Sequence, residues 1–297
     1  PEIEEWHDDI FVKKMHFLSW KESIKNLHNP DSTKDFNSIF FKRIAYDEIF
    51  ANLLFLSNNR NIIKKIKKTF KKFKSALSNQ LIQNLPYSLT NGQKKIINEI
   101  NEDLNSNLRM FRILQGDVGS GKTIIAIIAA LNSIEAGYQC GLMAPTSILA
   151  EQHFKLLNEL ILKSNLKIKI ELITGKVDAK KRKQILHNLK HNKIDFLVGT
   201  HALFQKTISF NNLGLIIIDE QHKFGVKQRI KFAKKGGVNC DVLLMSATPI
   251  PRTMMMSIYG DMDTSRLEEK PKYRQKILTL SKPENKIDEL WPFIEKK

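Results

Sequence analysis

Residues 114–125 read LQGDVGSGKTII, and this short stretch decides the fold of the chain. Gly116–Thr123 has the spacing of a phosphate-binding loop: glycine, four residues, glycine, lysine and threonine. The apolar segment Phe111–Gln115 before it fits a strand, and Thr123–Ala136 after it fits a helix with Gly137 as its C-cap. A glycine-rich turn that arises by chance is the alternative, but the flanking strand and helix disfavour it. The stretch therefore predicts a loop whose backbone N–H groups and helix N-terminus converge on an anion.

The residue types in this loop suit a nucleoside triphosphate with magnesium. Its three glycines let the backbone curl closely around the phosphates. Lys122 is placed to meet the β and γ phosphates, and the Thr123 hydroxyl is placed to ligate Mg²⁺. The predicted cofactors are therefore ATP and Mg²⁺. The predicted nucleotide-binding residues of the loop are Gly116, Asp117, Val118, Gly119, Ser120, Gly121, Lys122 and Thr123.

A second stretch, Leu213–Glu220, reads LGLIIIDE and fits a buried strand that ends in two carboxylates. Asp219 is predicted to hold Mg²⁺ through its hydration shell, and Glu220 to orient and deprotonate the attacking water. For such a pair alone, an ordinary helix N-terminus is the simpler interpretation, because acids suit the helix dipole. Together with a phosphate-binding loop in the same chain, the pair predicts a hydrolase.

From Leu85 onward, short apolar runs alternate with helical segments, a pattern typical of βαβ units around a parallel sheet. The sequence therefore predicts an α/β fold in which residues 85–267 form a P-loop NTPase domain with a parallel sheet flanked by helices. A second helix of this domain is expected over Ser147–Lys163. The predicted strands are Phe111–Gln115, Gln139–Ala144, Lys167–Ile173, Asp195–Val198, Leu213–Ile218 and Asp241–Met245.

Residues 1–84 contain no glycine and show helical spacing, so they are predicted to form a mainly helical unit. Its clearest helix is expected over residues 62–77. Lysines fill the positions between the apolar residues of this helix, and we interpret them as a solvated outer face, with contact to a phosphate backbone as the alternative. The apolar stripe consists of Ile62, Ile66, Phe70, Phe73 and Leu77.

The 297 residues carry a formal net charge of +17, which favours an anionic partner such as nucleic acid. A lysine-rich composition spread over a solvated surface explains the charge equally well. The two cysteines, Cys140 and Cys240, show neither disulfide nor metal-site spacing, which is typical of a reducing compartment. The longest apolar run, Ile124–Leu131, is too short to cross a bilayer. We therefore expect a soluble cytoplasmic protein without membrane association.

Residues 219–226, DEQHKFGV, resemble motif II of the superfamily-two helicases, and more narrowly that of the RecG family of branched-DNA helicases. Further blocks follow in the order of the family. The resemblance covers about residues 85–267 and implies that this domain is the first RecA-like lobe of a helicase. The other blocks that resemble family motifs are Leu89–Thr90 with Gln93, Met143–His153, Thr174–Gly175, Val198–Gln205 and Ser246–Thr253.

The resemblance also implies roles for single residues. Gln93 is implied to read the adenine base. His222 is implied to link the nucleotide site to Ser246 and Thr248, so that loss of the γ phosphate alters the grip on DNA. The implied catalytic residues are Lys122, Asp219, Glu220 and His222. The implied DNA-contacting residues, of which the two threonines also suit helix caps, are Thr146, Gly175, Thr200 and His201.

The two ends of the chain resemble other parts of the same family. Residues 1–84 resemble the connector between the fork-binding wedge and the motor, without the wedge itself. Residues 268–297 are expected to be a linker and the start of a second RecA-like lobe, with a strand over Lys276–Ser281. Because arginines of a second lobe accelerate hydrolysis by roughly 10³ to 10⁵, we expect this chain to bind ATP, to hydrolyse it slowly if at all and not to translocate. The implied partner is branched double-stranded DNA, engaged by a monomer in recombination and repair.

Two alternatives remain open from the sequence. The transcription-repair coupling translocases have a similar motor, but they usually show a second glutamate where this chain has Gln221. A nucleotide-gated module that binds DNA or partners without motor activity is the alternative outside the enzymes.

Overall fold

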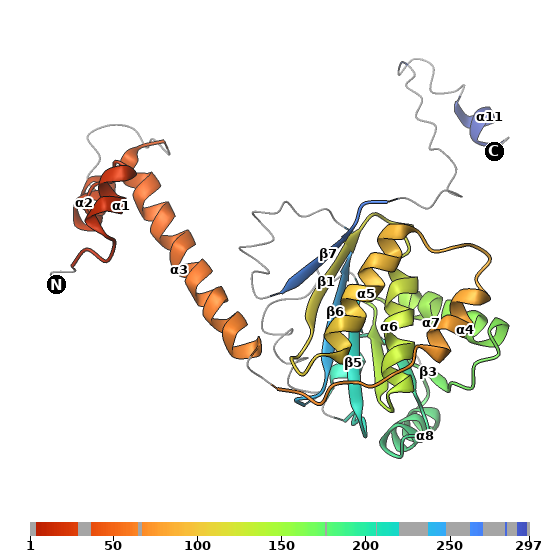
Figure 1. Ribbon diagram of the computed structural model, residues 1–297. Coiled ribbons are helices and arrows are strands. Elements are labelled where there is room, and N and C mark those ends of the chain that lie inside the picture. The colour runs from red at the N-terminus through yellow and green to blue at the C-terminus, as the bar shows by residue number, and fades with distance from the viewer. Residues whose placement is uncertain are drawn as a thin grey trace.

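The computed structural model describes residues 4–28, 37–64, 67–175, 177–205, 207–219, 237–247, 262–269, 283 and 290–295. It shows helices in the N-terminal part and a sheet flanked by helices in the part that follows (Figure 1). Within the described ranges, no helix combines the length and the apolar character needed to cross a membrane.

The described residues up to 64 contain three helices: α1 (Asp9–Lys14), α2 (Trp20–His28) and α3 (Ile39–Lys64). Arg43 on α3 is fully buried, and its guanidinium donates to Glu5 Oε1 at 2.6 Å and to Asp47 Oδ2 at 3.0 Å. The rings of Trp6 and Phe17 lie 5.8 and 5.7 Å from the same guanidinium. A buried cation with two anionic partners and two rings fixes the segment before α1 against α3.

The predicted helix over residues 62–77 is wrong. α3 ends at Lys64, and the next helix, α4 (Ala76–Gln83), begins twelve positions later in the numbering. The described residues between them, 67–75, contain no helix and are called the strap below. The strap forms one isolated antiparallel bridge, from Lys67 to Leu108. The apolar spacing that suggested a helix therefore belongs to two separate helices and an irregular segment.

Two of the five lysines of the strap differ from the predicted solvated face, whereas Lys67, Lys72 and Lys74 are exposed as predicted. Lys68 and Lys71 are buried, and the Nζ atoms of both donate to Asp241 Oδ2 at 2.6 Å. Lys68 Nζ also donates to the carbonyl oxygen of Asp103, and Glu135 accepts from the backbone N–H of Lys74 at 2.6 Å. These contacts join segments that are far apart in the sequence, so a local pattern of spacing has no information about them.

Among the residues that the structure describes, seven parallel strands form one sheet in the order β3-β4-β2-β5-β6-β1-β7. This sheet confirms the predicted α/β fold. Each of the six strands predicted between Phe111 and Met245 is present, and the largest difference is that β3 begins at Ile170 rather than at Lys167. Neighbours along a strand alternate between two apolar layers: Leu114 packs in the layer that contains α6, and Ile113 packs on the other face. The strands are β1 (Phe111–Gly116), β2 (Gln139–Met143), β3 (Ile170–Ile173), β4 (Phe196–Gly199), β5 (Leu213–Ile218), β6 (Asp241–Ser246) and β7 (Asp263–Leu267).

Helices cover the sheet, and Figure 1 shows α5 and α6 side by side in front of it. α6 is buried almost throughout, which explains why its sequence is apolar on every side. Its C-cap is Ala136, and Gly137 follows with a φ of 85°, so the predicted C-cap was one residue late. The other helices of the described part are α5 (Asn91–Asn105), α6 (Lys122–Glu135), α7 (Ser147–Lys163), α8 (Ala179–Lys190), the 3-10 helix η1 (His201–Phe204) and α11 (Leu290–Glu295).

The edge strand β7 was not predicted as a strand, because its sequence, DTSRL, has no apolar run. It pairs in parallel with β1, from Arg112 opposite Asp263 to Gly116 opposite Leu267. The approach is close: a Cβ on Gly116 would lie 3.0 Å from the Leu267 Cβ. Several predicted positions lie outside the described residues, namely Glu220, Gln221, His222, Thr248 and the strand Lys276–Ser281.

Both cysteines are free and fully buried, Cys140 on β2 and Cys240 just before β6. Burial raises the pKa of each thiol to about 12, so the reactive thiolate is scarce at neutral pH. We expect neither thiol to react with a chromogenic disulfide reagent in the native protein, and both to react after unfolding in guanidinium. Rapid modification of either thiol before unfolding would contradict this placement.

Candidate nucleotide-binding site

The predicted phosphate-binding loop lies between β1 and α6, at the edge where the parallel strands end, here called the carboxyl edge of the sheet (Figure 1). Gly119 and Gly121 have φ values of 78° and 95°, which glycine adopts without strain. Lys122 folds back over the loop, and its Nζ donates to the carbonyl oxygens of Gly116 at 2.6 Å and Asp117 at 2.8 Å. The loop thus holds a cation beside the N-terminus of α6, an arrangement that attracts phosphate.

Gln93 joins α5 to this loop. Its Oε1 accepts from the Thr90 N–H at 2.9 Å, and Thr90 Oγ1 accepts from the Gln93 N–H at 3.2 Å, which makes a capping box. Its Nε2 donates to the Ser120 carbonyl oxygen at 2.9 Å. A Cβ on Gly121 would collide with the Gln93 amide. The structure therefore brings Gln93, which lies far from the loop in the sequence, into direct contact with it.

Asp219 is the first residue after β5. Only β6 separates β5 from β1, and the three strands are parallel, so Asp219 and the loop lie at the same edge, with the two strands about 10 Å apart. The Asp219 N–H donates to the Met143 carbonyl oxygen at the end of β2, at 2.8 Å. Its carboxylate Oδ2 lies 2.7 Å from His153 Nε2, on α7. His153 was not predicted as a site residue, because this contact joins two elements that are distant in the chain.

A cavity of about 310 Å³ opens beside the loop. It joins the loop to the ends of β6 and β7, and Arg266 brings a second cation to it. Glu269 follows closely, and its Oε2 accepts from the Gly92 N–H at 2.9 Å, which lowers the pKa of this carboxyl. Arg266 and Glu269 were not predicted, since they depend on the pairing of β7 with β1. The cavity is lined by Gln115, Gly116, Asp117, Ala247, Arg266, Leu267 and Glu268.

The other predicted site residues of the described part also follow strand ends at the carboxyl edge. Thr146 is the N-cap of α7, and its Oγ1 accepts from the Leu149 N–H at 3.3 Å, so the cap interpretation of this residue is confirmed. Thr200 precedes η1 without a side-chain capping bond. These residues are Thr146 after β2, Gly175 after β3, Thr200 and His201 after β4, and Ser246 at the end of β6.

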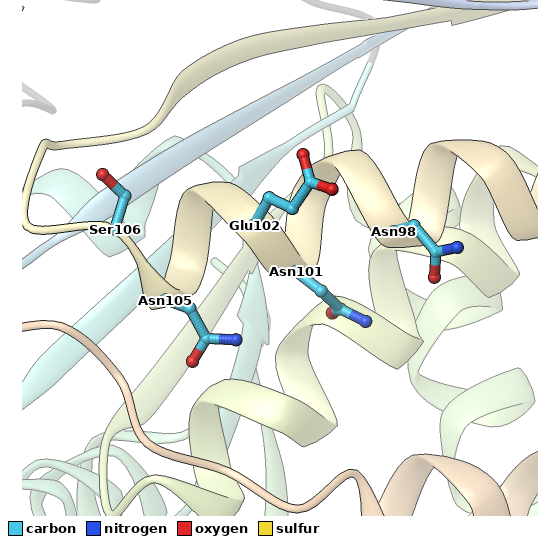
Figure 2. Close-up of a pocket in the computed structure, with 5 residues that line it drawn as sticks. All are labelled: Asn98, Asn101, Glu102, Asn105 and Ser106. Atoms are coloured by element: carbon cyan, nitrogen blue, oxygen red, sulfur yellow. The ribbon is translucent and has the colours of Figure 1, made fainter.

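A larger, open cavity of about 470 Å³ lies along α5, and Figure 2 shows the five polar residues that line it. Asn98, Asn101 and Asn105 project from one side of the helix, and Glu102 projects from another (Figure 2). Asn101 is already engaged, because its Oδ1 accepts from Asn132 on α6 at 2.8 Å. The cavity extends to the Ser106 end of α5, the end opposite to the Gln93 contact with the loop. It is separate from the candidate nucleotide site.

Comparison with known proteins places this fold and loop in a family. The DEAD/DEAH box helicase family model matches residues 90–257, and the chain belongs to this family. Within it, the chain is 40% identical over 99% of its length to the ATP-dependent DNA helicase RecG of Aquifex aeolicus. It is 39% identical over 99% of its length to the RecG of Thermotoga maritima. These matches confirm the resemblance to the RecG helicases.

A solved structure agrees with the sequence relatives. The structure of RecG bound to a three-way DNA junction is similar over 99% of this chain, with a TM-score of 0.81 and 36% identity. The chain spans 39% of that protein, and 38% and 37% of the Aquifex and Thermotoga relatives. The similarity therefore covers nearly all of this chain and less than half of each of these relatives.

Proposed function

We propose that this chain is the ATP-binding lobe of an ATP-dependent DNA helicase that remodels branched DNA in recombination and repair. One observation carries the proposal: the phosphate-binding loop and Asp219 lie at one edge of a sheet in a chain that resembles RecG throughout. The loop supplies the anion site, and the acidic pair that follows β5 supplies the groups for hydrolysis.

In this proposal the loop amides and Lys122 bind the phosphates of ATP, and Glu220 deprotonates the attacking water. The Thr123 hydroxyl and the Asp219 carboxylate are oxygen donors at the same edge, a donor set that suits Mg²⁺. Bound there, the ion would neutralise charge that develops on the phosphates. His222 would relay the state of this site to Ser246 and Thr248.

We propose that Gln93 binds the adenine base, and its contacts within the protein determine which hydrogen-bonding groups remain for the base. An amide group has two donor hydrogens and two acceptor lone pairs. Ser120 and Thr90 take one of each, so one hydrogen on Nε2 and one lone pair on Oε1 remain. Because the same side chain contacts the loop, binding of the base and of the phosphates would be linked through Gln93.

The DNA side of the proposal uses the residues that follow β2, β3 and β4. We propose that Thr146, Gly175, Thr200 and His201 lie along the DNA, since all four follow strand ends at the carboxyl edge. The net charge of +17 supports an anionic partner. We propose that nucleotide binding changes these DNA contacts, because the four residues lie at the same edge of the sheet as the phosphate-binding loop.

The experiment is an ATPase assay of the full-length protein with two DNA substrates of equal length and base composition, a three-way junction and a linear duplex. We expect the junction to stimulate ATP turnover several-fold more strongly than the duplex, with turnover dependent on Mg²⁺. Equal stimulation by both DNAs would refute the preference for branches. Absence of Mg²⁺-dependent turnover with either DNA would refute the motor itself.

A further inference from the structure

His153 on α7 makes a side-chain contact with the carboxylate assigned to the metal. Its Nε2 lies 2.7 Å from Asp219 Oδ2, and the side chains are only 11% and 13% exposed. An ionised carboxylate can only accept hydrogen bonds, so Nε2 carries the hydrogen and donates it to Oδ2. The donor and the acceptor of this hydrogen bond are therefore assigned, and the low exposure of both side chains limits competition from water.

The two partners are held by different parts of the fold. The backbone of Asp219 is fixed at the end of β5 by its bond to Met143, which leaves the side-chain torsions to be set by contacts of the carboxylate. His153 lies on a helix that is anchored by the buried residues Ala150 and Leu157. A rigid donor that holds one carboxylate oxygen limits the directions in which the other oxygen can point.

We propose that His153 is a positioning residue that sets the orientation of the Asp219 carboxylate for magnesium. The inference rests on the proposed function, in which Asp219 holds the ion. The same contact connects α7, the helix that begins after Thr146 in the proposed DNA track, directly to the metal carboxylate. His153 itself touches neither nucleotide nor water in this role; it acts through Asp219.

The test compares three variants of the full-length protein. His153→Leu removes the donor and retains bulk, whereas His153→Gln places an amide Nε2 donor at a similar distance from the backbone. His187→Leu is the matched control, because His187 is an exposed histidine on another helix, α8. ATP turnover is titrated with Mg²⁺, and binding of a fluorescent ADP is measured separately in EDTA.

We expect the half-saturating Mg²⁺ concentration of His153→Leu to rise about tenfold or more, because loss of a partner that orients a metal ligand typically has this effect. His153→Gln and His187→Leu should stay near the wild type, and metal-free ADP binding should be the same in all four proteins. An unchanged Mg²⁺ titration in His153→Leu would overturn the inference. Weakened metal-free ADP binding would also overturn it, since that indicates a general structural defect.

The proposed function fails in a different way. If the wild type shows no Mg²⁺-dependent turnover, the function and the inference fall together. If the wild type turns over ATP normally and His153→Leu matches it at every Mg²⁺ concentration, the function stands and only the role of His153 is lost.

Discussion

Lys122→Ala in the full-length protein is expected to reduce DNA-stimulated ATP hydrolysis by at least about 10² to 10³-fold, the usual loss when a preorganised group that stabilises transition-state charge is removed. Lys122 is the cation of the phosphate-binding loop, and its Nζ already lies within 2.8 Å of two loop carbonyl oxygens. Alanine at this position has no charge to offer the β and γ phosphates. The measurement is steady-state ATP turnover with junction DNA, next to equilibrium binding of that DNA.

A matched control distinguishes the loss of the loop cation from a general loss of positive charge. Lys183→Ala removes one positive charge from an exposed position on α8 and should leave turnover unchanged. Junction DNA binding should stay measurable in both variants, because DNA is proposed to contact other residues. If Lys122→Ala altered DNA binding but not hydrolysis, the chain would be a nucleotide-gated binding module rather than part of a motor.

The sequence predicted the loop and the sheet well because their signals are local. A glycine-rich stretch between an apolar strand and an apolar helix carries its whole pattern within a short segment, and β1 and α6 appear within one residue of their predicted bounds. Buried parallel strands such as β5 are continuous apolar runs, which are also visible without knowledge of their neighbours.

The features that the sequence missed depend on contacts between distant segments. β7 is a strand because it pairs with β1, although its own sequence alternates poorly. The strap has the spacing of a helix, yet Lys68 and Lys71 are drawn into the interior by Asp241, which lies more than a hundred positions further along the chain. His153 lies in a block that resembles a family motif, but its contact with Asp219 depends on how α7 packs beside the end of β5, which the sequence does not show.

Asp241→Ala is expected to lower the free energy of unfolding by about 3 to 5 kcal/mol, the usual cost of leaving buried charges without their partner. Asp241 Oδ2 accepts from Lys68 and Lys71, and its Oδ1 accepts from the Met110 N–H at 2.7 Å, just before β1. The variant keeps two buried ammonium groups and loses the anion that both of them contact. Denaturant unfolding followed by circular dichroism measures the change in midpoint.

Asp195→Ala provides the matched control, because Asp195 lies at the start of a strand of the same sheet, immediately before β4, and Asp241 is the first residue of β6. The Asp195 carboxylate accepts from the Lys169 N–H at 2.8 Å at an exposed site, so its loss should cost only about 1 kcal/mol. Equal losses for the two aspartates would mean that the ion pairs of the strap contribute nothing beyond an ordinary hydrogen bond.

The deficit of Asp241→Ala should also shrink as the pH is raised from about 7 towards 10, the region below the usual lysine pKa. Burial lowers the pKa of Lys68 below its usual value of 10.5, and attraction to Asp241 is the largest effect that opposes this. Without Asp241 the pKa of Lys68 falls further, so the folded variant binds fewer protons than the unfolded chain and its stability rises with pH. A deficit that stays constant over this range would show that the loss comes from packing and not from an uncompensated buried charge.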